Sequence, residues 1–345
     1  MKQTLTDANF PRTADLRVYH LGLRPGEVAN RIVTVGSPSR ARAISAHFDE
    51  QPKPFELASE RGFLTITGRY KGVPISVISI GMGHPNVDFF VREVRECLSG
   101  DMLIVRLGSC GSLIDVPVGS VVVPKSSVAV ERNLDFDFVN PQESTEKPYR
   151  ISKPVLADPE LHAQVHKSLA AAKPVDDGKP IVPSTTNASA DSFYSSQGRQ
   201  TSFPDQNENL IELLQESVND LATFEMETFW LYHLAACWSG RKASSMNAHA
   251  PPLAAAPVQP TASQHSPAAK APDSGSNALA GHETIIRAAA AQMVFASRTS
   301  QDFITPEDVA VLEEWTGKGV LDALAEMVIA PDRVHADQGT VWELA

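Results

Sequence analysis

The apolar residues of this chain fall mostly into short runs, and many of these runs are continuous rather than alternating. Residues 32–35 read Ile-Val-Thr-Val and residues 120–123 read Ser-Val-Val-Val, a pattern typical of strands that are covered on both faces. We therefore expect eight strands, at residues 31–36, 63–70, 74–81, 102–107, 120–124, 181–186, 222–226 and 292–298.

Between these runs, apolar positions recur with the period of a helix. Residues 88–98 carry apolar side chains at positions 89, 90, 91, 94 and 98, and residues 158–171 begin with Asp-Pro. Residues 227–238 and 306–327 are also predicted to be helical, the last preceded by a Thr N-cap. Strands interleaved with helices predict an α/β protein, whose ligands bind where strand ends and loops converge.

One stretch departs from both patterns. Residues 244–281 contain six prolines and only two charged side chains, Lys270 and Asp273, among many Ala, Ser and Gln residues. Such a composition cannot build a hydrophobic core. We expect one catalytic domain over residues 1–345, with a disordered insertion at residues 244–281 inside it.

Composition and charge limit the partners. The formal net charge of −11 repels a polyanion, so we expect neither nucleic acid nor a membrane as a partner. No apolar run approaches the roughly 18 residues of a membrane span, and residues 1–15 lack the apolar segment of a secretory signal. Three cysteines without metal-like spacing suit a reducing compartment. These features predict a cytoplasmic protein.

Two segments place an arginine beside a glycine turn. Residues 34–40 read Thr-Val-Gly-Ser-Pro-Ser-Arg, so the Gly36 N–H can approach an anion that Arg40 binds as a planar fork. A plain strand-to-helix turn explains this pattern equally well. Arg106 lies inside an apolar strand and needs a counter-charge there, either a bound anion or a protein carboxylate such as Glu93.

Two further segments could bind a sugar and a base. Residues 223–228 read Thr-Phe-Glu-Met-Glu-Thr, and carboxylates accept hydrogen bonds from sugar hydroxyls, although paired glutamates at a helix start also suit the helix dipole. Residues 191–199 contain Phe193, Gln197 and Arg199. These three could stack on and hydrogen-bond to a flat imide base, or belong to a solvated polar loop.

In this order the segments resemble the nucleoside phosphorylase superfamily, specifically its uridine phosphorylase branch. Residues 18–23, Val-Tyr-His-Leu-Gly-Leu, are similar to the family's His-Leu-Gly-Leu opening. Residues 297–301, Ser-Arg-Thr-Ser-Gln, resemble the Asn-Arg-Thr-Gln-Gln stretch of the uridine branch, where purine phosphorylases carry Ser-Asp-His. The other matching segments are residues 36–40, 59–61, 106–111, 191–199 and 225–227.

The resemblance implies a fold and a reaction. The fold is a single-domain three-layer α/β/α sandwich with a mixed central sheet. The reaction is the reversible phosphorolysis of uridine to uracil and ribose 1-phosphate, a step of pyrimidine salvage. Inorganic phosphate is a co-substrate of this reaction, and no cofactor is expected. The family also implies a homodimer or higher homo-oligomer with shared active sites.

The resemblance also implies roles for single residues. Arg106, Gln197, Arg199 and Glu227 are expected to be catalytic, and His20 and Arg61 would reach the site of a neighbouring subunit. The expected phosphate ligands are Gly36, Arg40, Arg61, Arg106 and Ser109; the ribose ligands are His20, Met226 and Glu227; and the base ligands are Phe193, Gln197, Arg199 and Arg298.

Five positions depart from the family pattern. Ser37 replaces an aspartate, Ser109-Cys110 replaces two threonines, and Ser196 replaces a glycine. Gly62 replaces a glutamate associated with a monovalent-cation site, so we expect no metal.

Four other interpretations stay open: a purine nucleoside phosphorylase, a nucleosidase of the same family, a catalytically silent nucleoside-binding relative, and a regulatory or scaffold protein in which the insertion at residues 244–281 reuses the fold for partner binding. Gln197 and Arg199 disfavour a purine substrate, and the arginines expected to bind phosphate disfavour simple hydrolysis and the silent relative.

Overall fold

The computed structural model describes residues 4–175, 178–240 and 284–344, so the insertion expected at 244–281 lies outside the described residues. The strands are β1 (Leu5–Thr6), β2 (Arg12–Thr13), β3 (Arg31–Val35), β4 (Phe55–Ala58), β5 (Leu64–Tyr70), β6 (Val73–Ser79), β7 (Met102–Ser112), β8 (Val121–Arg132), β9 (Tyr149–Ile151), β10 (Val155–Leu156), β11 (Ile181–Ala190), β12 (Leu221–Glu225) and β13 (Ile286–Ser297). The helices are α1 (Pro38–Ser45), α2 (His84–Arg95), α3 (Pro159–Ala172), α4 (Leu210–Ser217), α5 (Thr228–Ser239) and α7 (Pro306–Glu326).

One mixed sheet organises the described part of the chain. Its main path runs β10-β8-β11-β12-β7-β3-β6-β5-β4, and β9 pairs with β8. Strand β13 pairs in parallel with β7 and antiparallel with β8. Because β7 and β8 are also connected through β12 and β11, β13 closes these five strands into a ring. Four of the ring strands each contribute one side chain to a small apolar cluster, Cys110, Val122, Ala222 and Val294.

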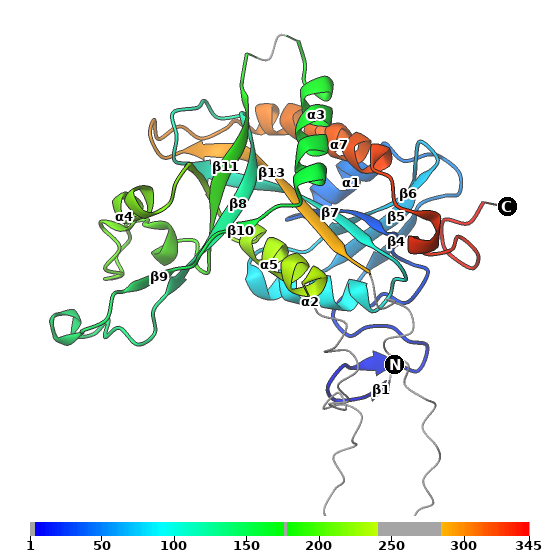
Figure 1. The fold of residues 1–345 in the computed structure, drawn as a ribbon, viewed down its shortest axis with the longest axis horizontal. Coiled ribbons are helices and arrows are strands. Elements are labelled where there is room, and N and C mark those ends of the chain that lie inside the picture. The colour runs from blue at the N-terminus through cyan, green and yellow to red at the C-terminus, as the bar shows by residue number, and fades with distance from the viewer. Residues whose placement is uncertain (1–3, 176–177, 241–283, 345) are drawn as a thin grey trace, which may run out of the picture.

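Helices cover both faces of the sheet (Figure 1). Helices α1, α3 and α7 lie on one face, and α2 and α5 lie on the other. Neighbouring side chains of β7 belong to two hydrophobic cores, one on each face of the sheet. Val105 packs with Ile44 of α1 and Leu324 of α7, whereas Ile104 packs with Phe90 of α2. Burial on both faces explains why the strands appear in the sequence as continuous apolar runs.

The expected three-layer α/β/α sandwich with a mixed sheet is confirmed. All eight expected strands and all four expected helices are present, with different ends. Strand β13 begins at Ile286 rather than at residue 292, because pairing with β7 holds Ala288–Ala291 in the sheet although alanine has little intrinsic strand preference. Helix α2 begins at His84 rather than at residue 88, with Pro85 in its first turn. Helices α1 and α4 and the closure of the ring were not predicted.

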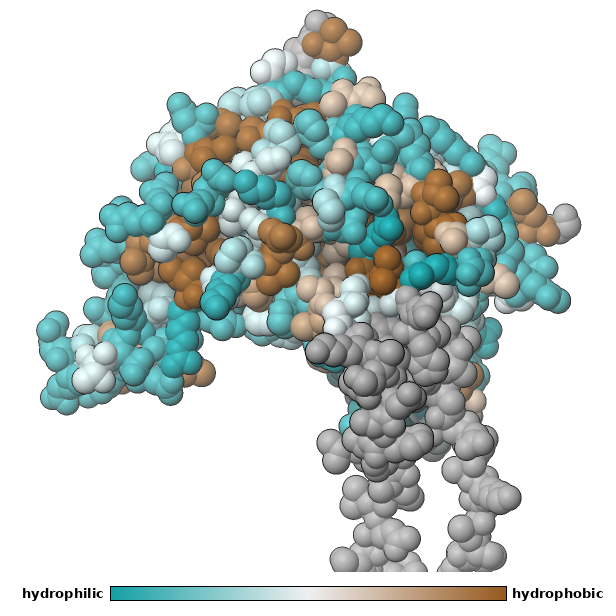
Figure 2. Space-filling view, in the orientation of Figure 1, coloured by the Kyte–Doolittle hydropathy of each residue, from teal (hydrophilic) through white to brown (hydrophobic). Residues whose placement is uncertain are grey.

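The outer surface is mainly hydrophilic, with separate smaller hydrophobic areas on the face that Figure 2 shows. Among the described residues, no helix has the length and apolar character needed to cross a lipid bilayer.

Close packing of α3 on α7 generates a test of the fold. A Cβ at Gly319 of α7 would lie 2.9 Å from Leu169 Cδ2 and 3.2 Å from Leu169 Cα. Because the Leu169 backbone cannot move away easily, we expect Gly319→Val to lower the free energy of unfolding by about 1–3 kcal/mol. Urea denaturation measures this change. Lys318→Val adds the same side chain on the exposed side of α7 and should cost less than about 0.5 kcal/mol. Equal losses in the two variants would contradict this packing.

Candidate active site

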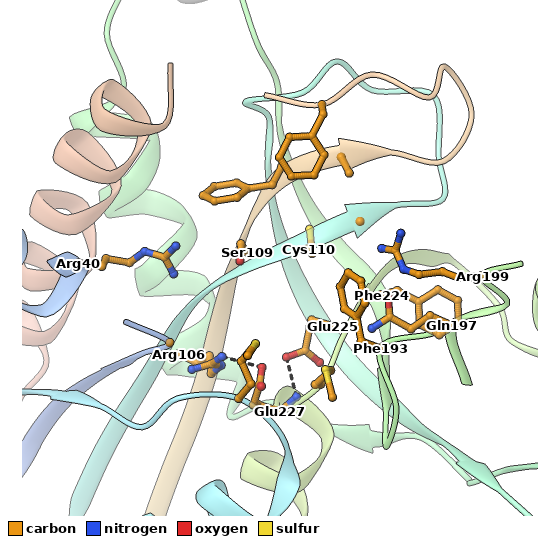
Figure 3. A pocket seen from close by; sticks show the side chains of 17 residues that line it. Arg40, Arg106, Ser109, Cys110, Phe193, Gln197, Arg199, Phe224, Glu225 and Glu227 are labelled. Carbon is orange, nitrogen blue, oxygen red and sulfur yellow. Dashed lines mark hydrogen bonds and ion pairs between the residues drawn. The ribbon is translucent and has the colours of Figure 1, made fainter. Parts of the chain in front are cut away.

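Strand ends and loops enclose a cavity of about 190 Å³. It receives side chains from β7, from the turn between β12 and α5, from the segment after β11, and from β13. Figure 3 shows Arg40 and Arg106 at one end and Phe193, Gln197 and Arg199 at the other. Nine of the twelve predicted site residues line this cavity: Gly36, Arg40, Arg106, Ser109, Phe193, Gln197, Arg199, Met226 and Glu227.

Arg106 lies on β7 and is 4% exposed. Its Nη2 donates to Glu227 Oε2 at 2.6 Å, while its Nε and Nη1 are buried without a partner among the described residues. Glu227, and not Glu93, is therefore the carboxylate that pairs with Arg106; Glu93 instead accepts from the backbone N–H of Leu21 at 2.8 Å. The two unpartnered nitrogens leave Arg106 with donors for an anion.

Arg40 brings a second positive charge to the same end. Ser37 caps α1 by accepting from the Arg40 N–H at 3.3 Å, and Arg40 Nε donates to Glu313 Oε1 at 2.7 Å. Burial lowers the pKa of Arg40, and the charge of Arg106 lowers this pKa further, while Glu313 opposes both effects. Two guanidinium charges at one end of a cavity form a site in which an anion is stabilised.

Two glutamates at the β12–α5 turn have different partners. Glu225 accepts from the backbone N–H groups of Glu227 and Thr228, each at 2.9 Å, and from Asn187 Nδ2 at 2.7 Å. Burial raises the pKa of Glu225, and the charge of Glu227 raises it further. Glu227 Oε1 accepts from the Gly83 N–H at 2.6 Å. Glu225 thus fixes the turn, and Glu227 joins the cavity wall to Arg106.

The opposite end offers a ring surface and polar donors. The Arg199 guanidinium lies 4.1 Å from the centroid of the Phe193 ring, and its Nε is buried without a partner among the described residues. Burial lowers the pKa of Arg199, and the charge of Arg298 adds to this. Gln197 is 2% exposed. Arg298 does not line the cavity; it donates to the Gln197 and Gly198 carbonyls at 3.1 and 3.2 Å.

His20 and Arg61 lie outside this cavity. His20 Nδ1 is 2.6 Å from Glu93 Oε1, and its ring stacks on Phe89 at 3.8 Å between centroids. The exposed Arg61 guanidinium lies 4.7 Å from the Tyr19 ring centroid and donates to the Tyr19 hydroxyl. The Tyr19 and His20 rings are in edge contact at 4.9 Å. These residues form one surface cluster.

Eight other residues also line the cavity: Met82, Cys110, Gly111, Phe224, Glu225, Phe295, Ala296 and Phe303. Of these, Glu225 could have been found from the Glu-Met-Glu motif, but apolar residues such as Phe295 have no signal of their own in the sequence. Within the described ranges, no group of three His, Cys, Asp or Glu residues could hold a metal ion.

The cavity therefore combines a cationic end, a carboxylate and a flat end with polar donors. Together with the mixed sheet, these features define an α/β enzyme that brings a small anion to a substrate carrying a polar ring. A family model described as the phosphorylase superfamily matches residues 30–243. The chain belongs to this family.

Individual relatives of this chain are also nucleoside phosphorylases. A uridine phosphorylase of Thermococcus kodakarensis is 32% identical over 240 residues, which make up 68% of this chain and 78% of the relative. A DeoD-type purine nucleoside phosphorylase of Myxococcus xanthus is 34% identical over 153 residues, 41% of this chain and 62% of the relative.

Solved structures of phosphorylases are also similar to this chain. A structure from work on two uridine phosphorylases of the oomycete Phytophthora capsici is 35% identical, has a TM-score of 0.76, and aligns over 94% of this chain and 100% of its own. A Trypanosoma brucei nucleoside phosphorylase, with a TM-score of 0.65, is 21% identical over 92% of this chain and 100% of its own, and shows the likeness of the fold.

The buried Arg106–Glu227 pair can be tested through stability. Arg106→Met should lower the free energy of unfolding by about 3–5 kcal/mol, because it leaves the Glu227 carboxylate buried without its cation. Adding Glu227→Gln should recover part of this loss, since the uncompensated charge is then removed. Urea denaturation measures both.

The matched control is the exposed Arg42–Glu56 pair, whose side chains are 56% and 47% exposed. Arg42→Met should cost less than about 1 kcal/mol. If Arg106→Met lowers the free energy of unfolding no more than Arg42→Met does, the buried pair does not stabilise the fold as we predict.

Proposed function

We propose that this protein is a uridine phosphorylase, which converts uridine and inorganic phosphate reversibly to uracil and ribose 1-phosphate. The observation that carries the proposal is the two-ended cavity. Arg40 and Arg106 lie at one end, with two nitrogens of Arg106 unpartnered among the described residues; Phe193, Gln197 and Arg199 lie at the other, and Glu227 lies between them. The similarity to uridine phosphorylases over most of the chain supports the same reaction.

Phosphate would bind at the end formed by Arg40 and Arg106. Ser109 and the Gly36 N–H line the same end, and the N-terminus of α1 begins just after Gly36. Charge-assisted hydrogen bonds of about 1.5–3 kcal/mol each fix the anion as a nucleophile, and the helix dipole favours its charge. The chain supplies these groups itself, so the reaction needs phosphate as co-substrate and no other cofactor.

Ribose would lie across the middle of the cavity. Glu227 uses its two oxygens for Arg106 and Gly83, and each oxygen keeps a lone pair that can accept from the 2′- or 3′-hydroxyl. Met226 would pack on the sugar ring. A phosphate oxygen held below the sugar then forms the bond to C1′ while the C1′–N1 bond breaks and its electron pair passes to uracil. Holding the reactants in this orientation supplies much of the rate.

Uracil would leave at the opposite end. The electron pair from the broken bond spreads onto the ring oxygens, and the uracil anion then takes a proton from water. Arg199 and Gln197 are donors already in position for these oxygens, with Phe193 against the ring face. Arg298 holds the Gln197–Gly198 backbone in place. Stabilisation of developing charge by one such donor is worth about 3–4 kcal/mol.

We also propose that two copies of the chain share their active sites. His20 and Arg61 lie in one surface cluster outside the cavity of their own chain. In a dimer, His20 would accept a hydrogen bond from the 5′-hydroxyl of the ribose bound by the partner, and Arg61 would bind its phosphate. The pairing of Glu93 with His20 Nδ1 leaves Nε2 for this contact.

Phosphate dependence tests the proposed reaction. Uracil release from uridine should require inorganic phosphate, and inosine should react far more slowly because Arg298 and Thr299 stand where a purine enzyme carries its aspartate acid. Arg199→Met should lower kcat/KM for uridine by about 10²–10³, whereas Arg150→Met, at an exposed arginine, should leave it unchanged. Release without phosphate would indicate a nucleosidase, and a preference for inosine would indicate a purine phosphorylase.

Complementation between defective subunits tests the shared site. Arg61→Ala and Arg199→Met should each be nearly inactive as homo-oligomers. In a co-expressed heterodimer, the Arg199→Met subunit supplies Arg61 to the intact cavity of the other subunit, so one site in two should recover. Differently tagged subunits allow the heterodimer to be purified and assayed. If Arg61 acts on its own chain, both cavities of the heterodimer stay defective and no activity returns.

A further inference from the structure

Gln292 is a buried amide with a hydrogen-bond partner for its nitrogen but none for its oxygen among the described residues. It lies on β13, is 0% exposed, and does not line the cavity. Its Nε2 donates to Thr228 Oγ1 at 2.5 Å, which ties it to the residue next to Glu227. Its Oε1 is buried and has no hydrogen-bond partner among the described residues. A buried acceptor without a donor is costly, so this oxygen needs an explanation.

An unsatisfied donor close to this oxygen belongs to Arg106, at the cationic end of the cavity. Gln292 pairs with Gly108 across β13 and β7. A Cβ on Gly108 would lie 2.6 Å from Gln292 Oε1 and 3.6 Å from Arg106 Nε. The unpaired acceptor, Gln292 Oε1, and the unpaired donor, Arg106 Nε, therefore lie beside the same small space above Gly108. That space exists because position 108 has no side chain.

We propose that Gln292 is a positioning residue for Arg106: its Oε1 accepts a hydrogen bond from Arg106 Nε when phosphate is bound, and so holds Nη1 toward the anion. Hydrogen bonds of catalytic groups are often long without substrate and shorten in the complex. The contact would fix the guanidinium from behind, while Glu227 fixes it from the side through Nη2. This inference rests on the proposed function, because it assumes that Arg106 binds phosphate.

The test measures phosphate affinity directly, by calorimetry of the full-length protein without nucleoside, together with KM for phosphate and KM for uridine. Gln292→Met has a similar length but no acceptor. Gly108→Ala keeps Gln292 but places a methyl group where Oε1 lies. Both variants should weaken phosphate binding by about tenfold or more, as expected for a lost hydrogen bond to a charged group. KM for uridine should change by less than about twofold.

A second pair of variants separates positioning from a general effect on folding. Thr228→Val removes the acceptor for Gln292 Nε2 and should also weaken phosphate binding, whereas Thr228→Ser retains the hydroxyl and should bind phosphate like the wild type. A purely structural role of Gln292 predicts instead a lower Tm with phosphate affinity unchanged in Gln292→Met and Gly108→Ala, and that result would overturn the proposal. If the wild type itself binds no phosphate, the proposed function fails first, and the inference fails with it.

Discussion

The ion pair between Arg106 and Glu227 is the interaction on which the rest of the site depends. Both side chains are 5% exposed, so each would be costly without the other. The pair joins the middle of β7 to the start of α5, and Glu227 also accepts from the Gly83 N–H before α2. These contacts together set the direction of the Arg106 guanidinium, the position of the Glu227 carboxylate and the path of the loop beside them.

The neighbouring Glu225 shows how the fold keeps two close carboxylates in different roles. Glu225 accepts from Asn187, Ser189 and two backbone N–H groups, so its oxygens are used within the protein. Glu227 is matched to a guanidinium and stays at the cavity wall. Glu225 also lines the cavity, but a carboxylate held by this many hydrogen bonds within the protein stabilises a turn, whereas one paired at the cavity wall can exchange its contacts with a ligand.

The sequence predicted the layers and most residues of the cavity, because continuous apolar runs mark buried strands and the glycine and arginine motifs are local. It named Glu93 as an example of a carboxylate partner for Arg106 and not Glu227, since the true partner depends on which distant segments meet. The closure of the ring was missed because β13 begins with a run of alanines that carries no strand signal. The contact of Arg61 with Tyr19, beside His20, joins distant segments at the surface, which no spacing within the sequence encodes.

The position of β13 in the sheet has a consequence for protein synthesis. This strand is the last of the sheet to leave the ribosome, yet it lies between β7 and β8, which are made far earlier. Until residue 297 has emerged, the edges of β7 and β8 that β13 will cover present unpaired backbone groups, which are prone to pair with other chains. A nascent chain that stops short of this point lacks a strand that joins β7 to β8, rather than one at the edge of the sheet.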